Sequence, residues 1–321
     1  MGDSGEPASG DERLERKERA RTEQPARVGD WLQRGARRLA HSPTPAVDAR
    51  LLLGYVLGVD TTTLLIHDTA PVAPDDAATY AALLDRAAAQ EPIPYLTGTA
   101  PFYDLQLRVT PDVLIPRPET EQLVDHALRW GAGRKDLWVV DVGTGSGCIA
   151  VTLARHLPLA AVSALDRSAA ALQVARTNAD RLGVADRLAW VEGDLLEPLL
   201  PLDPGGRPLL LTANLPYVSD AEWTELGDGV KSFEPELALR GGADGLDLVR
   251  RLLQQVAQSM AQGAAAGDWA IFMEIGWRQG PAAQALTERM LPGWAVTLHK
   301  DYAGQDRLIT ALHQALEPSP Q

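Results

Sequence analysis

Cysteine and long apolar runs are almost absent from this sequence. It contains a single cysteine, Cys148, and no apolar run approaches the ~20 residues of a membrane-spanning helix. One cysteine excludes an internal disulfide and a cysteine-rich zinc site, and it is typical of a reducing cytosol. The six histidines show no paired ligand spacing, so we expect no metal site.

The charge of the chain restricts both its location and its partners. Positive groups are scarce, with 30 Lys and Arg against 43 Asp and Glu and a formal net charge of −13. Because nucleic-acid binding depends on basic groups that neutralise phosphates, we expect no direct nucleic-acid partner. The beginning of the chain lacks the apolar stretch of a signal peptide, and its arginines alternate with acids, unlike a transit peptide. We therefore expect a cytoplasmic protein with no membrane partner.

Length and apolar pattern predict two unequal domains. The 321 residues are 45% hydrophobic, which is enough for a large core, and the chain exceeds one average domain. Residues 1–27 are rich in Gly, Pro and charge, which favours a disordered tail over the alternative of a binding arm. In residues 28–95 apolar side chains recur at helical spacing, as at Tyr80 and Leu84, so we expect a small helical domain.

A change of periodicity follows the helical domain. In residues 96–118 apolar and polar positions alternate, which predicts a hairpin linker. Pro118 suits a first helical turn, and we expect that helix to run through Leu128. Residues 119–315 then alternate strands with helices, which is typical of a mostly parallel sheet covered on both faces. The expected strands are 137–142, 161–165, 188–192, 208–213 and 269–275, followed by an antiparallel pair at 294–298 and 308–312.

A glycine-rich turn follows the first expected strand of the sheet. Glycine allows the backbone to turn sharply and to approach a ligand without a Cβ in the way. The spacing Gly-x-Gly-x-Gly differs from the Gly-x-Gly-x-x-Gly of dinucleotide sites, so a pyrophosphate is not the expected ligand. The turn consists of Gly143, Thr144, Gly145, Ser146 and Gly147.

Acidic residues follow the next two strands. Asp166 ends the second strand, at the place where sheets of this type bind ribose hydroxyls with a carboxylate. Asp194, with Leu195 beside it, follows the third strand and is expected to border an adenine. The plainer alternative is that both aspartates only cap helices or turns. Because the three strand ends share one sheet edge, the sequence favours a nucleoside ligand.

The fourth strand ends in a short polar segment, Asn214, Leu215, Pro216 and Tyr217. The Asn214 side-chain oxygen and the Leu215 carbonyl are two acceptors that can together orient both hydrogens of an NH2 group. Pro216 restricts the backbone before it and so directs that carbonyl. We expect the Tyr217 ring to pack against a flat amide. An ordinary Asn-Pro turn is commoner, but the position opposite the glycine turn favours a catalytic segment.

Together with their neighbours, these residues resemble the HemK/PrmC family, the methyltransferases that modify the glutamine of the Gly-Gly-Gln motif in class I peptide chain release factors. The resemblance extends over nearly the whole chain from about residue 30. Its most specific parts are residues 115–121 and 233–235, because methyltransferases in general lack both. The other matching stretches are 91–93, 96–98, 141–147, 241–247 and 301–304.

The resemblance implies a fold and an activity. The fold is an α/β, Rossmann-like class I methyltransferase fold, with a mostly parallel seven-stranded sheet, a C-terminal antiparallel hairpin and an N-terminal helical domain for substrate recognition. The activity is transfer of a methyl group from S-adenosyl-L-methionine to the glutamine amide nitrogen by a monomeric enzyme. The implied cofactor residues are Gly143 to Gly147, Asp166, Asp194, Leu195 and Asn214, and the implied substrate residues are Asn214 to Tyr217, Arg117, Glu119, Phe233 and Glu234.

One departure leaves alternatives open. The family usually has Pro where this chain has Leu215, and Asn-Leu-Pro-Tyr is closer to the ribosomal-RNA adenine dimethyltransferases. An N6-adenine methyltransferase acting on RNA or DNA is therefore the main alternative, although the acidic charge opposes it. A second alternative is a non-catalytic nucleoside-binding module. Glu234 has two possible roles, seating the substrate or bracing the loop after the fourth strand.

Overall fold

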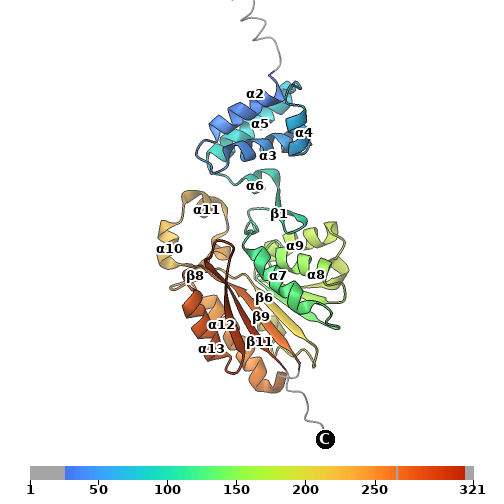
Figure 1. Cartoon of the computed structure of the whole chain (residues 1–321), viewed down its shortest axis with the longest axis vertical. Helices are drawn as coiled ribbons and strands as arrows, with labels where there is room; N and C mark the ends of the chain where they lie inside the picture. Colours follow the sequence, from blue (N-terminus) through green and yellow to red (C-terminus); the bar gives the residue numbers. More distant parts are fainter. Residues whose placement is uncertain (1–25, 265–266, 315–321) are drawn as a thin grey trace, which may run out of the picture. The chain divides into compact units, whose positions relative to one another are not determined.

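The computed structural model describes residues 26–264 and 267–314 and divides into two compact units, residues 1–97 and 98–321 (Figure 1). The tail predicted at residues 1–27 lies outside the described residues, apart from its last two positions. Of the helices that the structure describes, none is long and apolar enough to cross a membrane.

The first unit consists of helices around a buried tyrosine. Tyr80 is fully buried, its hydroxyl donates to the Ala49 carbonyl at 3.1 Å, and its ring meets Trp31 edge-on at 6.0 Å between centroids. Residues 93–97, which span the predicted boundary between the helical domain and the hairpin linker, form a short helix, because proline is tolerated in a first helical turn. The helices are α2 (Val28–Arg38), α3 (Pro45–Leu57), α4 (Thr61–Ile66), α5 (Pro74–Ala88) and α6 (Ile93–Thr97).

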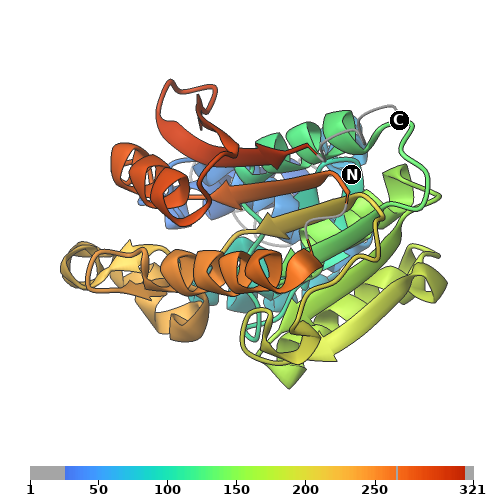
Figure 2. The same ribbon diagram turned by 90° about the horizontal axis from the view of Figure 1, so that it is seen from below.

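The second unit contains a seven-stranded sheet in the order β10-β11-β9-β6-β3-β4-β5, and Figure 2 shows these strands following one another across the unit. The five predicted parallel strands and the terminal antiparallel pair are confirmed. The strands are β3 (Trp138–Val142), β4 (Ala161–Asp166), β5 (Leu188–Glu192), β6 (Leu209–Ala213), β9 (Trp269–Glu274), β10 (Ala295–Lys300) and β11 (Asp306–His313).

Helices cover both faces of this sheet (Figure 1). Successive residues of a strand point to opposite faces, so Val139 packs in one apolar core and Val140 in the other. Helix α7 begins at Thr120 rather than at Pro118, because residues 117–121 first form two tight turns. One face carries α7 (Thr120–Gly131), α8 (Cys148–His156) and α9 (Ala169–Arg181), and the other carries α12 (Asp247–Ser259) and α13 (Gly280–Met290).

Two additions to the sheet flank its carboxyl edge. The predicted hairpin is confirmed as β1 (Thr99–Phe102) and β2 (Leu105–Arg108), and its apolar residues pack in the core beneath α7 and α8, so it belongs to the second unit. A segment between β6 and α12 brings residues 233–235 toward this edge. It contains β7 (Val218–Ser219), α10 (Asp220–Glu225), α11 (Asp228–Phe233) and β8 (Arg240–Gly242).

The strand order itself locates a ligand site. From β3 the chain proceeds to β4 and β5 on one side and then returns to β6 on the other. In open α/β sheets, ligands bind outside the carboxyl ends of the strands at the point where the order reverses. That point lies between the ends of β3 and β6.

Candidate active site

A cavity of about 750 Å³ lies at this point of the second unit. This volume falls within the range of small-molecule sites. The structure places there most of the residues that the sequence predicted, namely Gly143 to Ser146, Asp166, Asp194, Leu195, Asn214, Leu215, Pro216 and Arg117. Gly147, Glu119, Tyr217, Phe233 and Glu234 are not part of its lining.

The glycine turn forms one wall of the cavity. The amides of Gly143 and Thr144 both donate to the Leu165 carbonyl at 2.9 Å, which holds the turn over the end of β4. Gly143 has a φ of +73°, and a Cβ there would lie 3.1 Å from the Leu215 side chain. A glycine is therefore required both by the backbone conformation and by the approach of the β6 end.

Asp166 lies beside this turn with both oxygens engaged by the backbone. Its carboxylate accepts hydrogen bonds from the amides of Gly145 and Ser168, each at 2.9 Å. Burial raises the pKa of this carboxyl above its usual value. Each oxygen can accept a further hydrogen bond. Asp166 can therefore hold the backbone of the turn and still accept a bond from a ligand hydroxyl.

Asp194 and Leu195 form the wall beyond β5. The Asp194 carboxylate pairs with Arg251 at 2.9 Å. Leu195 has a φ of +52°, a conformation that a residue with a Cβ adopts at a cost of about 1 kcal/mol or more. Such strain in a residue that lines a cavity is typical of functional sites.

A buried acid, Asp141, connects the two central strands and was not among the predicted site residues. It accepts hydrogen bonds from the hydroxyls of Thr144 at 2.7 Å and Thr212 at 2.8 Å, and it is fully buried. Burial raises its pKa to about 6. The signal in the sequence is an aspartate inside an otherwise apolar strand.

The residues after β6 face the glycine turn. Asn214, Leu215 and Pro216 line the cavity, and Leu215 is only 4% exposed. The Leu215 side chain packs in the apolar core and against Gly143. Leucine at this position therefore fills space next to the glycine turn while its backbone carbonyl stays at the end of the strand.

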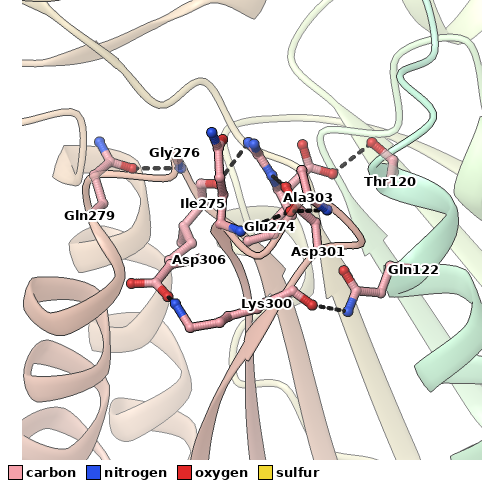
Figure 3. Close-up of polar contacts among 12 residues, drawn as sticks. Thr120, Gln122, Glu274, Ile275, Gly276, Gln279, Lys300, Asp301, Ala303 and Asp306 are labelled. Atoms are coloured by element: carbon pink, nitrogen blue, oxygen red, sulfur yellow. Dashed lines mark hydrogen bonds and ion pairs between the residues drawn. The ribbon is translucent and has the colours of Figure 1, made fainter.

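Two glycines and a glutamine hold the backbone after β6. A Cβ at Gly241 would lie 2.5 Å from the Pro216 carbonyl oxygen, and one at Gly245 would lie 2.2 Å from the Tyr217 carbonyl oxygen. Gln279 donates to that Tyr217 oxygen at 2.8 Å and accepts from the Gly276 amide (Figure 3). The glycines within residues 241–247 are thus needed because the backbone of residues 216–217 passes very close to them.

A chain of hydrogen bonds runs behind Asn214, and sequence reasoning missed two of its members. The Asn214 side-chain nitrogen donates to the Thr120 hydroxyl at 2.9 Å. This hydroxyl in turn donates to Glu274 at 2.6 Å (Figure 3). The Tyr217 hydroxyl lies 3.5 Å from the other Glu274 oxygen. Thr120 and Glu274 are 0% and 2% exposed. The available signals were a glutamate at the end of an apolar strand and the threonine within residues 115–121.

Glu274 is the buried acid of this chain of contacts, and its surroundings change its pKa. Burial raises its pKa to about 7, although its bond from Thr120 and the charge of Arg307 both favour ionisation. Arg307 is fixed by Asp301 at 3.3 Å, and Asp301 also accepts from the Ala303 amide in the turn between β10 and β11 (Figure 3). The stretch at residues 301–304 thus positions a cation near the buried glutamate.

A partly buried ion pair connects the two stretches that carried the most specific resemblance. Arg117 pairs with Glu234 at 2.6 Å, and the Glu234 side chain is 3% exposed. The Ile115 amide also donates to this carboxylate at 3.4 Å. Removing Arg117 would leave the buried Glu234 carboxylate without its cation, and because Arg117 is partly solvent-exposed the cost lies below the about 3–5 kcal/mol of a fully buried pair. Glu234 therefore braces the loop, while its role toward a substrate stays a prediction.

Within residues 26–264 and 267–314, no group of three or more His, Cys, Asp or Glu side chains is arranged to hold a metal ion.

Comparisons with known proteins show the family of this chain. The model of the PrmC N-terminal domain matches residues 30–98, and that of a methyltransferase domain matches residues 139–233. A release factor glutamine methyltransferase of Bordetella pertussis is 42% identical over 84% of this chain and 96% of its own length. The enzymes of the same name from Bacillus subtilis and Cereibacter sphaeroides are each 38% identical, over 82% and 89% of this chain and 90% and 98% of their own lengths.

The raised pKa of Glu274 predicts a pH-dependent change in stability. A carboxyl whose pKa rises from 4.5 to about 7 on folding stabilises the folded state below pH 4.5, and this contribution is lost as the pH rises through 7. Glutamine does not titrate, so we expect the Glu274→Gln variant to lack this pH-dependent contribution to stability. Urea denaturation across this pH range should therefore show the variant gaining stability relative to wild type as the pH increases. A difference in unfolding free energy between the two proteins that stays constant with pH would contradict the raised pKa of Glu274.

Proposed function

This chain belongs to the family of release factor glutamine methyltransferases, and we propose that it methylates the side-chain amide of the glutamine in the Gly-Gly-Gln motif of class I peptide chain release factors. The protein is an S-adenosylmethionine-dependent methyltransferase. The observation that carries the proposal is that Asn214 and Leu215 line the same cavity as the glycine turn and Asp166. We propose that the enzyme acts as a monomer in the cytoplasm.

The residues of the cavity fit S-adenosylmethionine. Gly143 and Gly145 line the cavity without a side chain, and Asp166 keeps acceptor capacity for ribose hydroxyls. Val142, Leu165 and other apolar residues complete the lining, as expected for a site that binds a purine. We propose Gly143 to Gly147, Asp166, Asp194, Leu195 and Asn214 as the cofactor-binding residues.

When bound, S-adenosylmethionine supplies a methyl group from its sulfonium. The rest of the cofactor then leaves as a neutral thioether. The protein must overcome the weak nucleophilicity of an amide nitrogen, whose lone pair is delocalised into the carbonyl. We propose that the Asn214 oxygen and the Leu215 carbonyl each accept one N–H of the substrate amide and so direct its nitrogen lone pair. Pro216 keeps the preceding carbonyl in place.

No strong base is needed before the methyl transfer. The amide nitrogen becomes acidic only as it is alkylated, so its proton can leave late. The contribution of the site is then proximity and orientation, which can supply about 7–11 kcal/mol of the barrier. The close packing of Gly241 and Gly245 against residues 216–217 and the bond from Gln279 to the Tyr217 carbonyl serve this orientation.

Residues around the cavity are the candidates for contact with the substrate protein. We propose that Arg117, Glu119, Phe233 and Glu234, together with residues 214–217, contact the substrate protein or shape its path. The Arg117–Glu234 pair holds two of these segments together. The proposed task of the first unit, which matches the PrmC N-terminal domain, is recognition of the release factor.

A substitution at Asp166 tests the cofactor assignment. Asp166→Asn should weaken S-adenosylmethionine binding roughly 10- to 100-fold, because hydrogen bonds to a charged group contribute about 1.5–3 kcal/mol. The measurement is titration calorimetry with S-adenosylmethionine. Asp180→Asn removes the same charge from an exposed position on α9 and is the matched control. Equal affinity of both variants would contradict the assignment.

Methylation of a release factor tests the reaction. Incubation with S-adenosylmethionine and a cognate class I release factor should add one methyl to the Gly-Gly-Gln peptide, detected by mass spectrometry. Asn214→Ala should lower the rate at least roughly 100-fold, since misplaced reactants lose about this factor, while cofactor binding stays largely intact because the other proposed cofactor residues remain.

A release factor with glutamate in place of that glutamine is the control, because it has no amide nitrogen to methylate. Methylation of adenine in RNA or DNA, with none on the release factor, would favour the alternative activity instead. Cofactor binding without any transfer would indicate a non-catalytic module.

A further inference from the structure

The amide of Asn214 has two ends, and only one of them can serve the proposed reaction. Its oxygen is an acceptor and its nitrogen is a donor, and the two ends exchange places when the side chain flips by about half a turn. A substrate NH2 group needs the oxygen. Something must therefore hold the nitrogen end away from the substrate position.

When Glu274 is ionised, the hydrogen bonds behind Asn214 have a single consistent direction. The Thr120 hydroxyl has one proton, and the Glu274 carboxylate, 2.6 Å away, can only accept it. Its oxygen must then act as acceptor toward Asn214, which selects the nitrogen end of the amide at 2.9 Å. Thr120 is fully buried and Glu274 is 2% exposed, so bulk water does not compete for these positions.

We propose that Thr120 and Glu274 are positioning residues that fix the orientation of the Asn214 amide, with its nitrogen bound to Thr120 and its oxygen left to accept from the substrate. This inference rests on the proposed function for its catalytic consequence. The orientation itself follows from the three side chains alone. It also gives a role to the threonine within residues 115–121, which neither the cofactor nor the substrate assignment had used.

The charge of Glu274 decides the direction of these bonds. The groups that face it are Thr120 from α7, Tyr217 after β6, Arg307 from β11 and Glu119 before α7. A protonated Glu274 can itself donate to Thr120, which frees the Thr120 proton to turn toward the Asn214 oxygen. The pKa of about 7 then places the loss of the correct orientation just below neutral pH.

Asparagine labelling gives a direct test, because the sequence contains only two asparagines, Asn178 and Asn214. Selective labelling with side-chain 15N should yield two NH2 signals, and Asn214→Ala assigns them. Asn178 is a built-in reference, since its nitrogen donates to the carbonyls of Arg108 and Ser146, both at 2.9 Å. The readout is the rate of hydrogen exchange at Asn214 divided by that at Asn178, measured without substrate.

Three variants of the full chain distinguish the proposal from a general loss of stability. Thr120→Val keeps the shape and should speed exchange at Asn214 roughly tenfold, the effect of one lost hydrogen bond, with Asn178 unchanged. Thr120→Ser keeps the hydroxyl and should restore most of the protection. Glu274→Gln should remove the pH dependence of the Asn214 rate relative to Asn178. In wild type the relative rate should rise as the pH falls from about 8 to about 6.

Kinetic measurements with a release factor as substrate test the catalytic consequence of the proposal. Thr120→Val should lower kcat roughly 10- to 100-fold, with S-adenosylmethionine affinity unchanged and recovery by Thr120→Ser. Equal exchange in wild type and Thr120→Val, or no recovery with serine, would overturn the inference.

The exchange experiment separates the inference from the proposed function. If wild type methylates no release factor but the exchange pattern holds, the proposed function fails and the positioning survives. If Thr120→Val does not fold, the pH series on wild type and Glu274→Gln decides alone, and a relative rate that does not change with pH would refute the proposal.

Discussion

The parallel pairing of β3 with β6 is the constraint on which the site depends. These strands lie next to each other at the centre of the sheet, and Val142 is paired with Ala213 at their carboxyl ends. Because the strands end together, the glycine turn that follows one must face the segment that follows the other. Leu215 packs against Gly143 as a consequence. The proposed positions of the methyl donor and the methyl acceptor thereby share one cavity, because of the register of two strands.

Two buried acids connect the elements around this cavity, and their removal from water is unfavourable. Asp141 and Glu274 are both removed from water, and burial raises the pKa of each, to about 6 and about 7. A buried carboxylate without partners is strongly unfavourable. Here each one is retained because hydroxyl groups donate to it, Thr144 and Thr212 to Asp141 and Thr120 to Glu274. The acids hold the two strand ends and the start of α7 in fixed relative positions.

Much of the second unit could be predicted from local patterns. Apolar runs identified the strands of the sheet, and the terminal antiparallel pair followed from its polar turn. Gly143, Asp166 and Asn214 could be placed on one edge because parallel strands share their carboxyl ends.

The remaining features depend on contacts between distant residues. Thr120 and Glu274 are 154 positions apart in the sequence, and Arg117 and Glu234 are 117 apart. No periodicity or spacing links such pairs, so the chain of bonds behind Asn214 became visible only in the folded molecule. The same is true of Gly241 and Gly245, whose need for a missing Cβ arises from the backbone of residues 216–217.

The most direct test of the account is a structure of the protein with a non-reactive analogue of S-adenosylmethionine and a peptide that contains Gly-Gly-Gln. The account predicts that the glutamine amide nitrogen lies within hydrogen-bonding distance of both the Asn214 side-chain oxygen and the Leu215 carbonyl. The analogue should lie against the glycine turn, with its sulfonium-equivalent atom next to that nitrogen. A glutamine held by other residues, or a segment after β6 that faces away from the analogue, would contradict it.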